Sequence, residues 1–275
     1  MALKIKPGQV VPEHWTSNDW EEKARENPLY AVMTTPDLIE ADAENFSPEM
    51  LESFFAKGQR VFAKHIAPRI PLVRTGADTP YMVEYGCGMG RILKAVLEAG
   101  HPCSGIDISP TMLRHCRDLV PGVRSLHLLD ENNRCDLDDA CADVVFSFAV
   151  LKHIHRLSIY ACAVDEMLRV LKPGGLLMLN VNCQDFERTG FDNPHRTENF
   201  EEYSLHFEPG KDKPYQRRAY TTWSGVYIGY DWLKHRLDNG GVSVLDTYYH
   251  TLKKKQGIWL VGTKGDSRPF SSAVK

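Results

Sequence analysis

Short apolar segments alternate with longer amphipathic ones through the middle of the chain. Five short segments are aliphatic or β-branched and are bounded by Gly, Pro or Asp, which is typical of β-strands: residues 81–86 (YMVEYG), 102–107 (PCSGID), 123–129 (VRSLHLL), 143–150 (DVVFSFAV) and 175–182 (GLLMLNVN). Three segments between them repeat apolar residues at helical spacing: residues 91–100, 109–119 and 157–175. Strands that alternate with helices form parallel sheets with helices on both faces, so the pattern predicts a doubly wound α/β sheet.

The sequence also predicts where two helices begin and how the segments on either side of the central sheet are organised. Ser47 with Pro48, and Ser109 with Pro110, are typical of a helix N-cap followed by the first helical position. The apolar stripe after Pro48 predicts that residues 1–70 form an N-terminal helical cap on a main domain of residues 71–275. Residues 183–225, after the fifth predicted strand, are polar and aromatic without a periodic segment, which predicts a lid insertion over a functional site. The pattern then predicts a closing helix at 230–241 and two strands within 242–264.

Composition limits the classes of partner. A chain of 275 residues with 43% hydrophobic residues can bury one large core. Its net charge of −3 offers no basic field, which argues against nucleic acid or a membrane surface as a partner. No apolar run approaches the roughly 20 residues of a membrane span. The seven cysteines include no CxxC pair and follow no leader, so we expect a reducing, cytoplasmic location. No Cys and His spacing is typical of zinc, and no metal is expected.

A glycine-rich turn follows the first predicted strand. Gly86, Gly88 and Gly90 stand at alternate positions before a helix. Open α/β sheets bind ligands at the carboxyl ends of their strands, where the free N–H groups of a helix start also point. Glycines also end strands for steric reasons alone, so this spacing is weak evidence by itself. Acids after the next two strands strengthen it: Asp107, about 20 residues on, where an acid binds a ribose diol, and Asp130 with Glu131.

The acid at Glu84 separates two classes of cofactor. A nicotinamide dinucleotide carries a pyrophosphate, which a carboxylate beside the turn would repel, and its sites prefer GxGxxG over the GxGxG found here. S-adenosylmethionine carries no phosphate but has an ammonium and a sulfonium, which a carboxylate attracts. The turn therefore favours S-adenosylmethionine.

Four motifs occur in order along the middle of the chain: VEYGCGMGRIL, SGIDISPTML, FSFAVLKHI and MLRVLKPGGLLML. Together they resemble the class I S-adenosylmethionine-dependent methyltransferases, most strongly over residues 80–182. The resemblance implies a Rossmann-like sheet of seven strands, the last of them an antiparallel insertion. It also implies S-adenosylmethionine as the methyl donor and S-adenosylhomocysteine as the product.

The same resemblance assigns cofactor contacts to residues of this chain. Gly86, Cys87 and Gly88 would pass beneath the methionine part of the cofactor, which Glu84 helps to hold. Asp107 would bind both ribose hydroxyls. The other predicted contacts follow the second, third and fourth strands: Ile108 and Met112 beside the adenine, Asp130 or Glu131 at the adenine amine, and Phe148.

Methyl transfer to a hydroxyl benefits from a general base with a pKa near 7, and histidine suits that task. His153 lies just beyond the fourth predicted strand, beside the expected methyl donor; alternatively, it only hydrogen-bonds backbone at a helix entry. His195 and His206, in the predicted lid, are the other candidate bases. Five further side chains in and just after the lid are predicted to line the acceptor pocket: Asp185, Tyr203, Tyr220, Trp223 and Tyr227.

Three hypotheses of function remain from the sequence. The favoured one is a methyltransferase for a small-molecule acceptor, with O-methylation of a sugar-like, phenolic or polyketide-type metabolite preferred to N-methylation of a small amine. The second is methylation of a macromolecule such as tRNA or protein, which predicts a basic face. The third is a binding module without turnover, which predicts eroded cofactor motifs. The sequence leaves the oligomeric state open.

Overall fold

A computed structural model describes residues 15–32, 46–154, 157–184, 228–251 and 256–265. In these ranges, seven strands form one sheet in the order β3-β2-β1-β4-β5-β9-β8. Their bounds are β1 Met82–Tyr85, β2 Cys103–Asp107, β3 Ser125–Leu128, β4 Ala142–Ser147, β5 Leu171–Val181, β8 Val242–Thr251 and β9 Gln256–Lys264. The pairs among β1 to β5 are parallel, whereas β9 runs antiparallel to both β5 and β8. The predicted doubly wound, mostly parallel sheet with an antiparallel last strand is confirmed.

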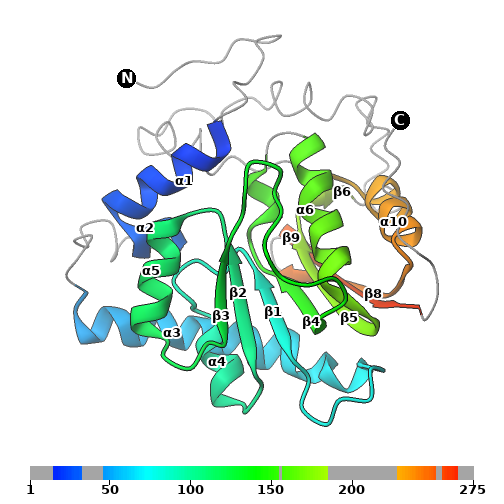
Figure 1. Ribbon diagram of the computed structural model, residues 1–275, viewed down its shortest axis with the longest axis horizontal. Coiled ribbons are helices and arrows are strands. Elements are labelled where there is room, and N and C mark those ends of the chain that lie inside the picture. The colour runs from blue at the N-terminus through cyan, green and yellow to red at the C-terminus, as the bar shows by residue number, and fades with distance from the viewer. Residues whose placement is uncertain (1–14, 33–45, 155–156, 185–227, 252–255, 266–275) are drawn as a thin grey trace.

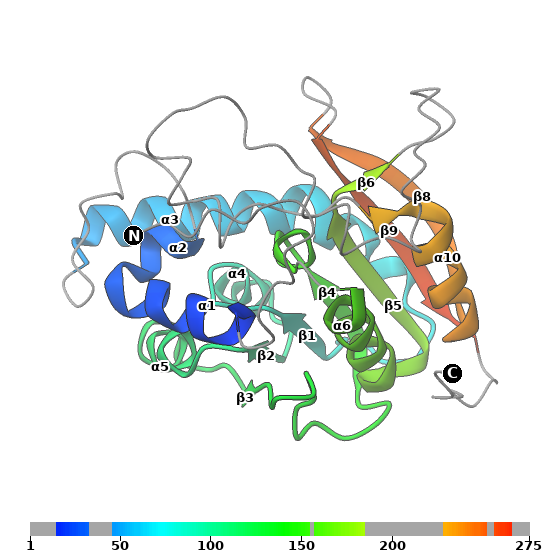
Figure 2. The same cartoon turned by 90° about the horizontal axis from the view of Figure 1, so that it is seen from above.

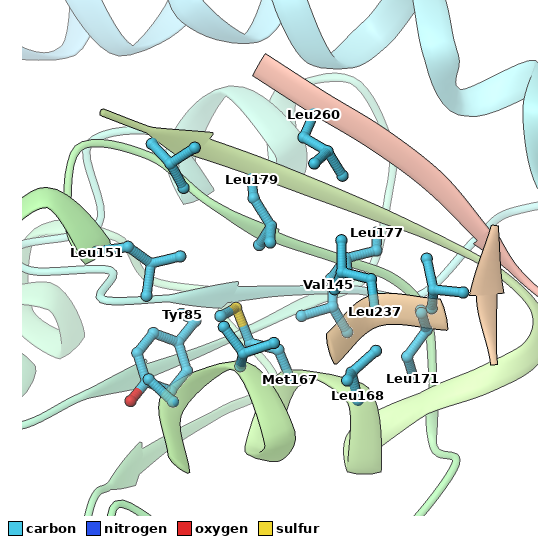
Figure 3. Close-up of a cluster of buried hydrophobic side chains, with 14 of the residues drawn as sticks. Tyr85, Val145, Leu151, Met167, Leu168, Leu171, Leu177, Leu179, Leu237 and Leu260 are labelled. Carbon is cyan, nitrogen blue, oxygen red and sulfur yellow. The ribbon is translucent and has the colours of Figure 1, made fainter. Parts of the chain in front are cut away.

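Helices cover both faces of this sheet. Figure 2 shows α6 (Leu157–Val170) and α10 (Tyr230–Asn239) on one side, and α3 (Pro48–Val61) with α4 (Leu93–Glu98) on the other. Successive side chains of a strand point to opposite faces. Val145 of β4 and Leu177 of β5 therefore pack against Met167 of α6 (Figure 3), while Phe146 belongs to the core on the other face. Both faces of the central strands are buried, as expected for parallel strands.

The remaining elements lie around these layers. Helix α5 spans Pro110–Leu119, and a helical turn, η4, spans Leu151–His153. A turn of π-helix, η2 (Phe62–Ile66), and a 3₁₀ segment, η3 (Ala67–Leu72), continue α3, and the short strands β6 (Cys183–Gln184) and β7 (Ile228–Gly229) pair with each other. None of the helices in the described ranges is both long and apolar enough to cross a membrane.

Both predicted helix starts are confirmed. The Ser47 Oγ accepts a hydrogen bond from the Met50 N–H at 3.2 Å, and α3 begins at Pro48. The Ser109 Oγ accepts one from the Met112 N–H at 3.1 Å at the start of α5. Each serine thus satisfies one backbone donor that a helix leaves unpaired at its N-terminus.

Several predicted boundaries were wrong. The helix predicted over 157–175 ends at Val170, because Pro173 has no N–H for a helical hydrogen bond and its ring clashes with the preceding turn. The next residue, Leu171, begins β5, whose pairing with β4 shifts register between Ala142 and Val144. The strand predicted over 143–150 ends at Ser147, because Ala149 adopts a φ of 62°, outside the extended region. The helix predicted over 91–100 is reduced to Leu93–Glu98.

The N-terminal helices pack on the main domain. Helices α1 (Trp15–Glu26) and α2 (Pro28–Val32) lie beside α5 in Figure 1. Ala24, Leu29 and Phe54 form an apolar cluster with Met89, in the turn after β1, and with Met112 of α5. The chain's first described helices therefore rest on the two segments that follow β1 and β2.

Candidate cofactor and acceptor site

A pocket of about 460 Å³ lies where the parallel strands end. Its walls come from the segments after β1, β2, β3 and β4, four neighbouring strands of the sheet. Trp20 of α1 and Ala31 and Val32 of α2 add a further wall. The volume is in the range typical of small-molecule sites, and the place is where open α/β sheets bind their ligands.

The floor of the pocket is the glycine turn after β1. Gly86 and Gly88 adopt φ values of 76° and 52°, which favour glycine. A Cβ at Gly86 would lie 2.3 Å from Val150 Cγ2, so a side chain there would also collide with the segment after β4. Gly86, Cys87 and Gly88 all line the pocket, so their predicted contact with the cofactor is possible in this place and stays a prediction.

Asp107, at the end of β2, ties this turn to the start of α5. Its buried carboxylate accepts hydrogen bonds from the Gly88 N–H at 2.8 Å and from the Ser109 N–H at 3.0 Å. Burial raises the pKa of Asp107, and these backbone hydrogen bonds partly offset the rise. Each carboxylate oxygen keeps a second lone pair for a further donor, and Asp107 lines the pocket with Ile108 and Met112.

Glu84 is buried on the wall of the same pocket. Among the described residues, none hydrogen-bonds its Oε2 atom. Burial raises the pKa of Glu84 well above its usual range, and the positive charge of Arg91 only partly opposes this. A buried carboxylate oxygen without a donor fits the ammonium of S-adenosylmethionine, which brings both charge and N–H groups.

The loop after β3 brings Asp130 and Glu131 to the pocket. The Asp130 Oδ1 accepts hydrogen bonds from the N–H groups of Asn132 and Arg134, both at 2.8 Å. These bonds lower the pKa of Asp130 and commit one of its oxygens to the shape of the loop. Both acids remain available to a ligand, and the two predicted alternatives stay open.

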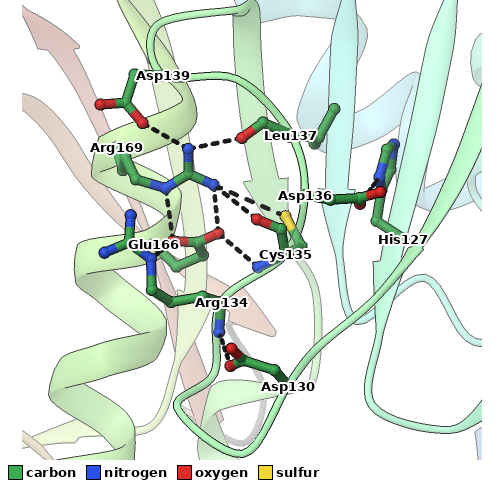
Figure 4. A network of polar contacts seen from close by, with 9 residues as sticks. All are labelled: His127, Asp130, Arg134, Cys135, Asp136, Leu137, Asp139, Glu166 and Arg169. Carbon is green, nitrogen blue, oxygen red and sulfur yellow. Dashed lines mark hydrogen bonds and ion pairs between the residues drawn. The ribbon is translucent and has the colours of Figure 1, made fainter.

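An ionic network anchors this loop to α6 (Figure 4). Arg169 donates to both carboxylate oxygens of Glu166, at 2.8 and 2.6 Å, and to the Leu137 carbonyl at 2.6 Å. Glu166 in turn accepts from the Cys135 N–H at 2.9 Å. Burial raises the pKa of Glu166, but the Arg169 guanidinium and the Cys135 N–H outweigh it, so the net direction is downward. The network holds the segment that positions Asp130.

The segment after β4 forms one side of the pocket. The segments after β2 and β3, which carry Asp107 and Asp130, form the other side, because β1 lies between β2 and β4 in the sheet. Phe148 lines the pocket and stacks on Trp259, with ring centroids 5.6 Å apart. His153 also lines the pocket, and its backbone N–H donates to the Val150 carbonyl at 2.9 Å. This bond belongs to the peptide group and not to the imidazole, so it does not decide between the structural and the catalytic interpretation of His153, and both stay predictions.

Two charged residues that line the pocket, and one that supports it from α1, were not predicted from the sequence. Arg91, next to the third glycine, and Lys152, next to His153, both line the pocket. Glu21 of α1 accepts hydrogen bonds from the Ser109 and Thr111 hydroxyls, at 2.6 and 2.8 Å. Arg91 and Lys152 lie within the motifs VEYGCGMGRIL and FSFAVLKHI, which was the available signal. Glu21 had none, because its partners lie about 90 residues away.

Some predicted residues lie outside the described ranges, and their roles stay predictions. They are the candidate bases His195 and His206, and the predicted acceptor residues Asp185, Tyr203, Tyr220, Trp223 and Tyr227. The predicted lid at 183–225 falls outside as well, except for Cys183 and Gln184.

The sequence is similar to those of known methyltransferases. Residues 83–179 match the family model described as a methyltransferase domain. A probable S-adenosylmethionine-dependent methyltransferase of Mycobacterium tuberculosis is 26% identical over 69% of this chain and 58% of its own length. A tRNA (carboxymethyluridine(34)-5-O)-methyltransferase of Arabidopsis thaliana is 26% identical over 67% of this chain and 45% of its own. The chain thus spans somewhat more than half the length of the mycobacterial relative.

A solved structure shows the same fold. Magnesium protoporphyrin IX methyltransferase from Synechocystis, with S-adenosylmethionine bound, superimposes with a TM-score of 0.54 at 11% identity, over 94% of this chain and 100% of that one. The sheet order, the glycine turn between two buried acids and the family match define the class. Residues 83–179 thus form a methyltransferase domain with a Rossmann-like fold, and the chain is similar to S-adenosylmethionine-dependent methyltransferases of class I.

Proposed function

We propose that the protein transfers a methyl group from S-adenosylmethionine to an oxygen of a small-molecule acceptor. The cofactor, when bound, supplies an electrophilic methyl group on its sulfonium. The chain must therefore bind the cofactor, hold the acceptor oxygen in line with it, exclude water and take up a proton if the acceptor is a hydroxyl.

Cofactor binding is the task of the residues after β1, β2 and β3. Asp107 would accept the ribose hydroxyls on the lone pairs that its two backbone hydrogen bonds leave. Glu84 would receive the ammonium, and the Gly86–Gly88 backbone would lie beneath the methionine part. Asp130 or Glu131 would meet the adenine amine.

Acceptor positioning falls to the segment after β4 and to α1. His153 is the described histidine on the pocket wall, and its neutral imidazole would take the proton of an acceptor hydroxyl. The rings of Trp20 and Phe148 exclude water on either side of this segment. An amine acceptor would already carry a lone pair and would not need such a base.

The observation that carries the choice of a small acceptor is the wall formed by Trp20, Ala31 and Val32. With this wall, the pocket is bounded by α1 and α2 as well as by the strand ends, which suits a ligand of limited size better than a long polymer. The net charge of −3 agrees, because RNA binding generally requires a basic surface. Because one relative is named a tRNA methyltransferase, a macromolecular acceptor is the alternative hypothesis that the experiment must test.

The test uses S-adenosylmethionine with a labelled methyl group. The protein is incubated separately with a small-metabolite extract, total tRNA and a protein fraction, with the Asp107→Ala variant as the control for background. We expect label in the small-metabolite fraction with the wild type alone, on an oxygen of the product. Label in tRNA or protein, or on a nitrogen, would contradict the proposed acceptor, and a wild type that does not bind S-adenosylhomocysteine would contradict the whole function.

A further inference from the structure

The charges that line the pocket separate along the sheet. Asp130 and Glu131 follow β3 and Asp107 follows β2, whereas Lys152 follows β4. Between them lie one acid and one base, Glu84 in β1 and Arg91 after the turn that follows it. Because the strand order is β3-β2-β1-β4, the pocket is acidic at the end assigned to the ribose and adenine and basic at the end that holds His153.

Lys152 is a cation on the pocket wall without a matching acid. Within the described ranges, neither an ion pair within 4.0 Å nor a hydrogen bond joins its ammonium to another side chain. Burial lowers the pKa of Lys152, and the charge of Arg91 lowers it further. Lys152 is half-buried, and charges removed from water are normally paired, so an anion that enters the pocket would compensate this charge.

Arg91 adds to the positive charge instead of relieving it. Its guanidinium lies 5.6 Å from the centroid of the Phe148 ring, and its buried Nε atom has no hydrogen-bond partner among the described residues. Burial lowers the pKa of Arg91, against the opposing effect of Glu84. No ion pair within 4.0 Å joins Arg91 to Glu84, both of which lie in the described part of the chain.

The basic region continues behind Phe148. The ring of His250 packs on Phe148 with centroids 5.2 Å apart. Burial lowers the pKa of His250, and the charges of Lys64 and Lys152 lower it further. The positive charges of Lys152, on the pocket wall, and of Lys64, at an exposed position, thus both reach His250 behind Phe148.

We propose that the methyl acceptor carries an anionic group, a carboxylate or a phosphate, which Lys152 binds at the His153 end of the pocket. The inference rests on the proposed function, since it assumes that an acceptor enters this pocket. An anion at Lys152 places the rest of the acceptor along the wall that carries His153 and Phe148. For the carboxylate of the cofactor, the candidate partner is Arg91, which directly follows the glycine turn.

Trace acetylation of the lysines tests the proposal without an acceptor of known identity. The full chain, saturated with S-adenosylhomocysteine, is treated with acetic anhydride, and the rate at each lysine is read by peptide mass spectrometry. Inorganic phosphate, benzoate and chloride are compared at equal ionic strength. A probe at several times its Kd should slow acetylation of Lys152 about fivefold relative to chloride, and Lys234, exposed on α10, should be unaffected.

Two outcomes of this experiment overturn the proposal. One is an equal rate at Lys152 in phosphate, benzoate and chloride. The other is full protection of Lys152 by S-adenosylhomocysteine alone, which would assign the lysine to the cofactor carboxylate. A protein that does not bind S-adenosylhomocysteine would instead refute the proposed function, so the two failures are distinguishable.

Substitution at Lys152 provides a second, independent readout. Calorimetric titration of phosphate and benzoate into the cofactor-product complex should show about tenfold weaker binding in Lys152→Met, because a charge-assisted hydrogen bond is lost. Lys152→Arg and the matched control Lys234→Met should keep the affinity, and all variants should bind S-adenosylhomocysteine as the wild type does. Unchanged anion affinity in Lys152→Met, or a loss of cofactor-product affinity, would overturn the assignment.

Discussion

The indole of Trp20, in α1, lies edge-on to the imidazole of His153, with ring centroids 5.4 Å apart and ring planes inclined by 66°. One ring belongs to the N-terminal helices and the other to the segment after β4, so this contact joins both sides of the pocket. Glu21, the next residue of α1, fixes the helix by hydrogen bonds to the start of α5. The position of Trp20 over the site thus depends on a carboxylate.

Glu21→Ala should loosen this wall. The change removes hydrogen bonds to the Ser109 and Thr111 hydroxyls, and bonds to a charged group are worth about 1.5–3 kcal/mol. We expect a lower Tm and weaker binding of S-adenosylhomocysteine, measured by calorimetry. Glu22→Ala, at an exposed position of the same helix, is the matched control. Equal effects of the two substitutions would contradict an anchoring role for Glu21.

The contribution of Glu21 should also depend on pH. Burial raises the pKa of Glu21, but the hydrogen bonds from Ser109 and Thr111 outweigh it, so the folded pKa lies below the ordinary value of 4.5. A depressed folded pKa gives stability that is present above the unfolded pKa and lost as the pH falls through the folded one. The difference in unfolding free energy between wild type and Glu21→Ala should therefore shrink below about pH 4.5.

Glu84→Gln should separate stability from cofactor binding. The Glu84 Oε2 atom is buried without a hydrogen-bond partner among the described residues, so removal of the charge should stabilise the free protein by about 1 kcal/mol, or roughly 2–4 °C in Tm. Affinity for S-adenosylmethionine should fall about tenfold, since a charge-assisted contact to the ammonium is lost. Glu98→Gln, exposed on α4, should change neither. A variant that is less stable and binds normally would show that Glu84 is only structural.

The pH dependence of this effect has the opposite sign from that of Glu21. Burial raises the folded pKa of Glu84 above its ordinary value. Below the unfolded pKa of about 4.5, the Glu84 carboxyl is protonated in both states and its burial costs the wild type no charge desolvation. As the pH rises from there through the folded pKa, the free energy of unfolding of the wild type falls. Thermal unfolding at several pH values should show the advantage of Glu84→Gln growing from pH 4.5 upward.

Arg169→Met should free the loop that carries Asp130. Removal of one partner of a buried ion pair costs about 3–5 kcal/mol, because Glu166 is left buried and charged. Denaturant unfolding should show this loss, and S-adenosylhomocysteine should bind more weakly to the folded fraction. Arg134→Met removes a more exposed arginine, 3.8 Å from the same glutamate, and should cost much less. A cost for Arg134→Met as large as that for Arg169→Met would argue against the network as the anchor.

The sequence predicted the parts of the molecule that depend on local pattern. The strand and helix alternation, the serine caps at Ser47 and Ser109 and the turn of Gly86 and Gly88 all follow from neighbours in the chain, and the structure bears them out. The end of α6 was missed because apolar periodicity continued into β5, and the break at Pro173 was given too little weight.

Contacts between residues far apart in the chain could not be predicted from the local sequence pattern. Nothing near Glu21 indicates that it meets Ser109, 88 residues away. The isolated charge of Lys152 depends on which acids the fold brings near it, and the sequence cannot show that those acids gather on the other strands. Predictions of the cofactor side were therefore more complete than those of the acceptor side.

His153→Ala tests the general base. If neutral imidazole accepts the proton, the rate of the wild type should fall as the pH drops below about 6 to 7. The substitution should lower kcat by roughly 10²-fold and leave cofactor affinity nearly unchanged. His235→Ala, exposed on α10, is the control. Normal turnover per folded molecule in His153→Ala would show that the residue is structural, and a pH step that vanishes only in His195→Ala or His206→Ala would move the base to those positions.

Calorimetric titration of S-adenosylhomocysteine into wild type, Asp107→Ala and Asp107→Asn tests the cofactor site most directly. Asp107→Asn keeps the side-chain volume and so controls for damage to the turn, and Asp118→Ala, exposed on α5, is the distant control. We expect the wild type and Asp118→Ala to bind alike and not to bind NAD. Both Asp107 variants should lose roughly 1.5–3 kcal/mol, about tenfold or more in affinity, since the ribose hydroxyls lose a charged acceptor. Wild-type affinity in a folded Asp107 variant, or binding of NAD in place of S-adenosylhomocysteine, would contradict the site described here.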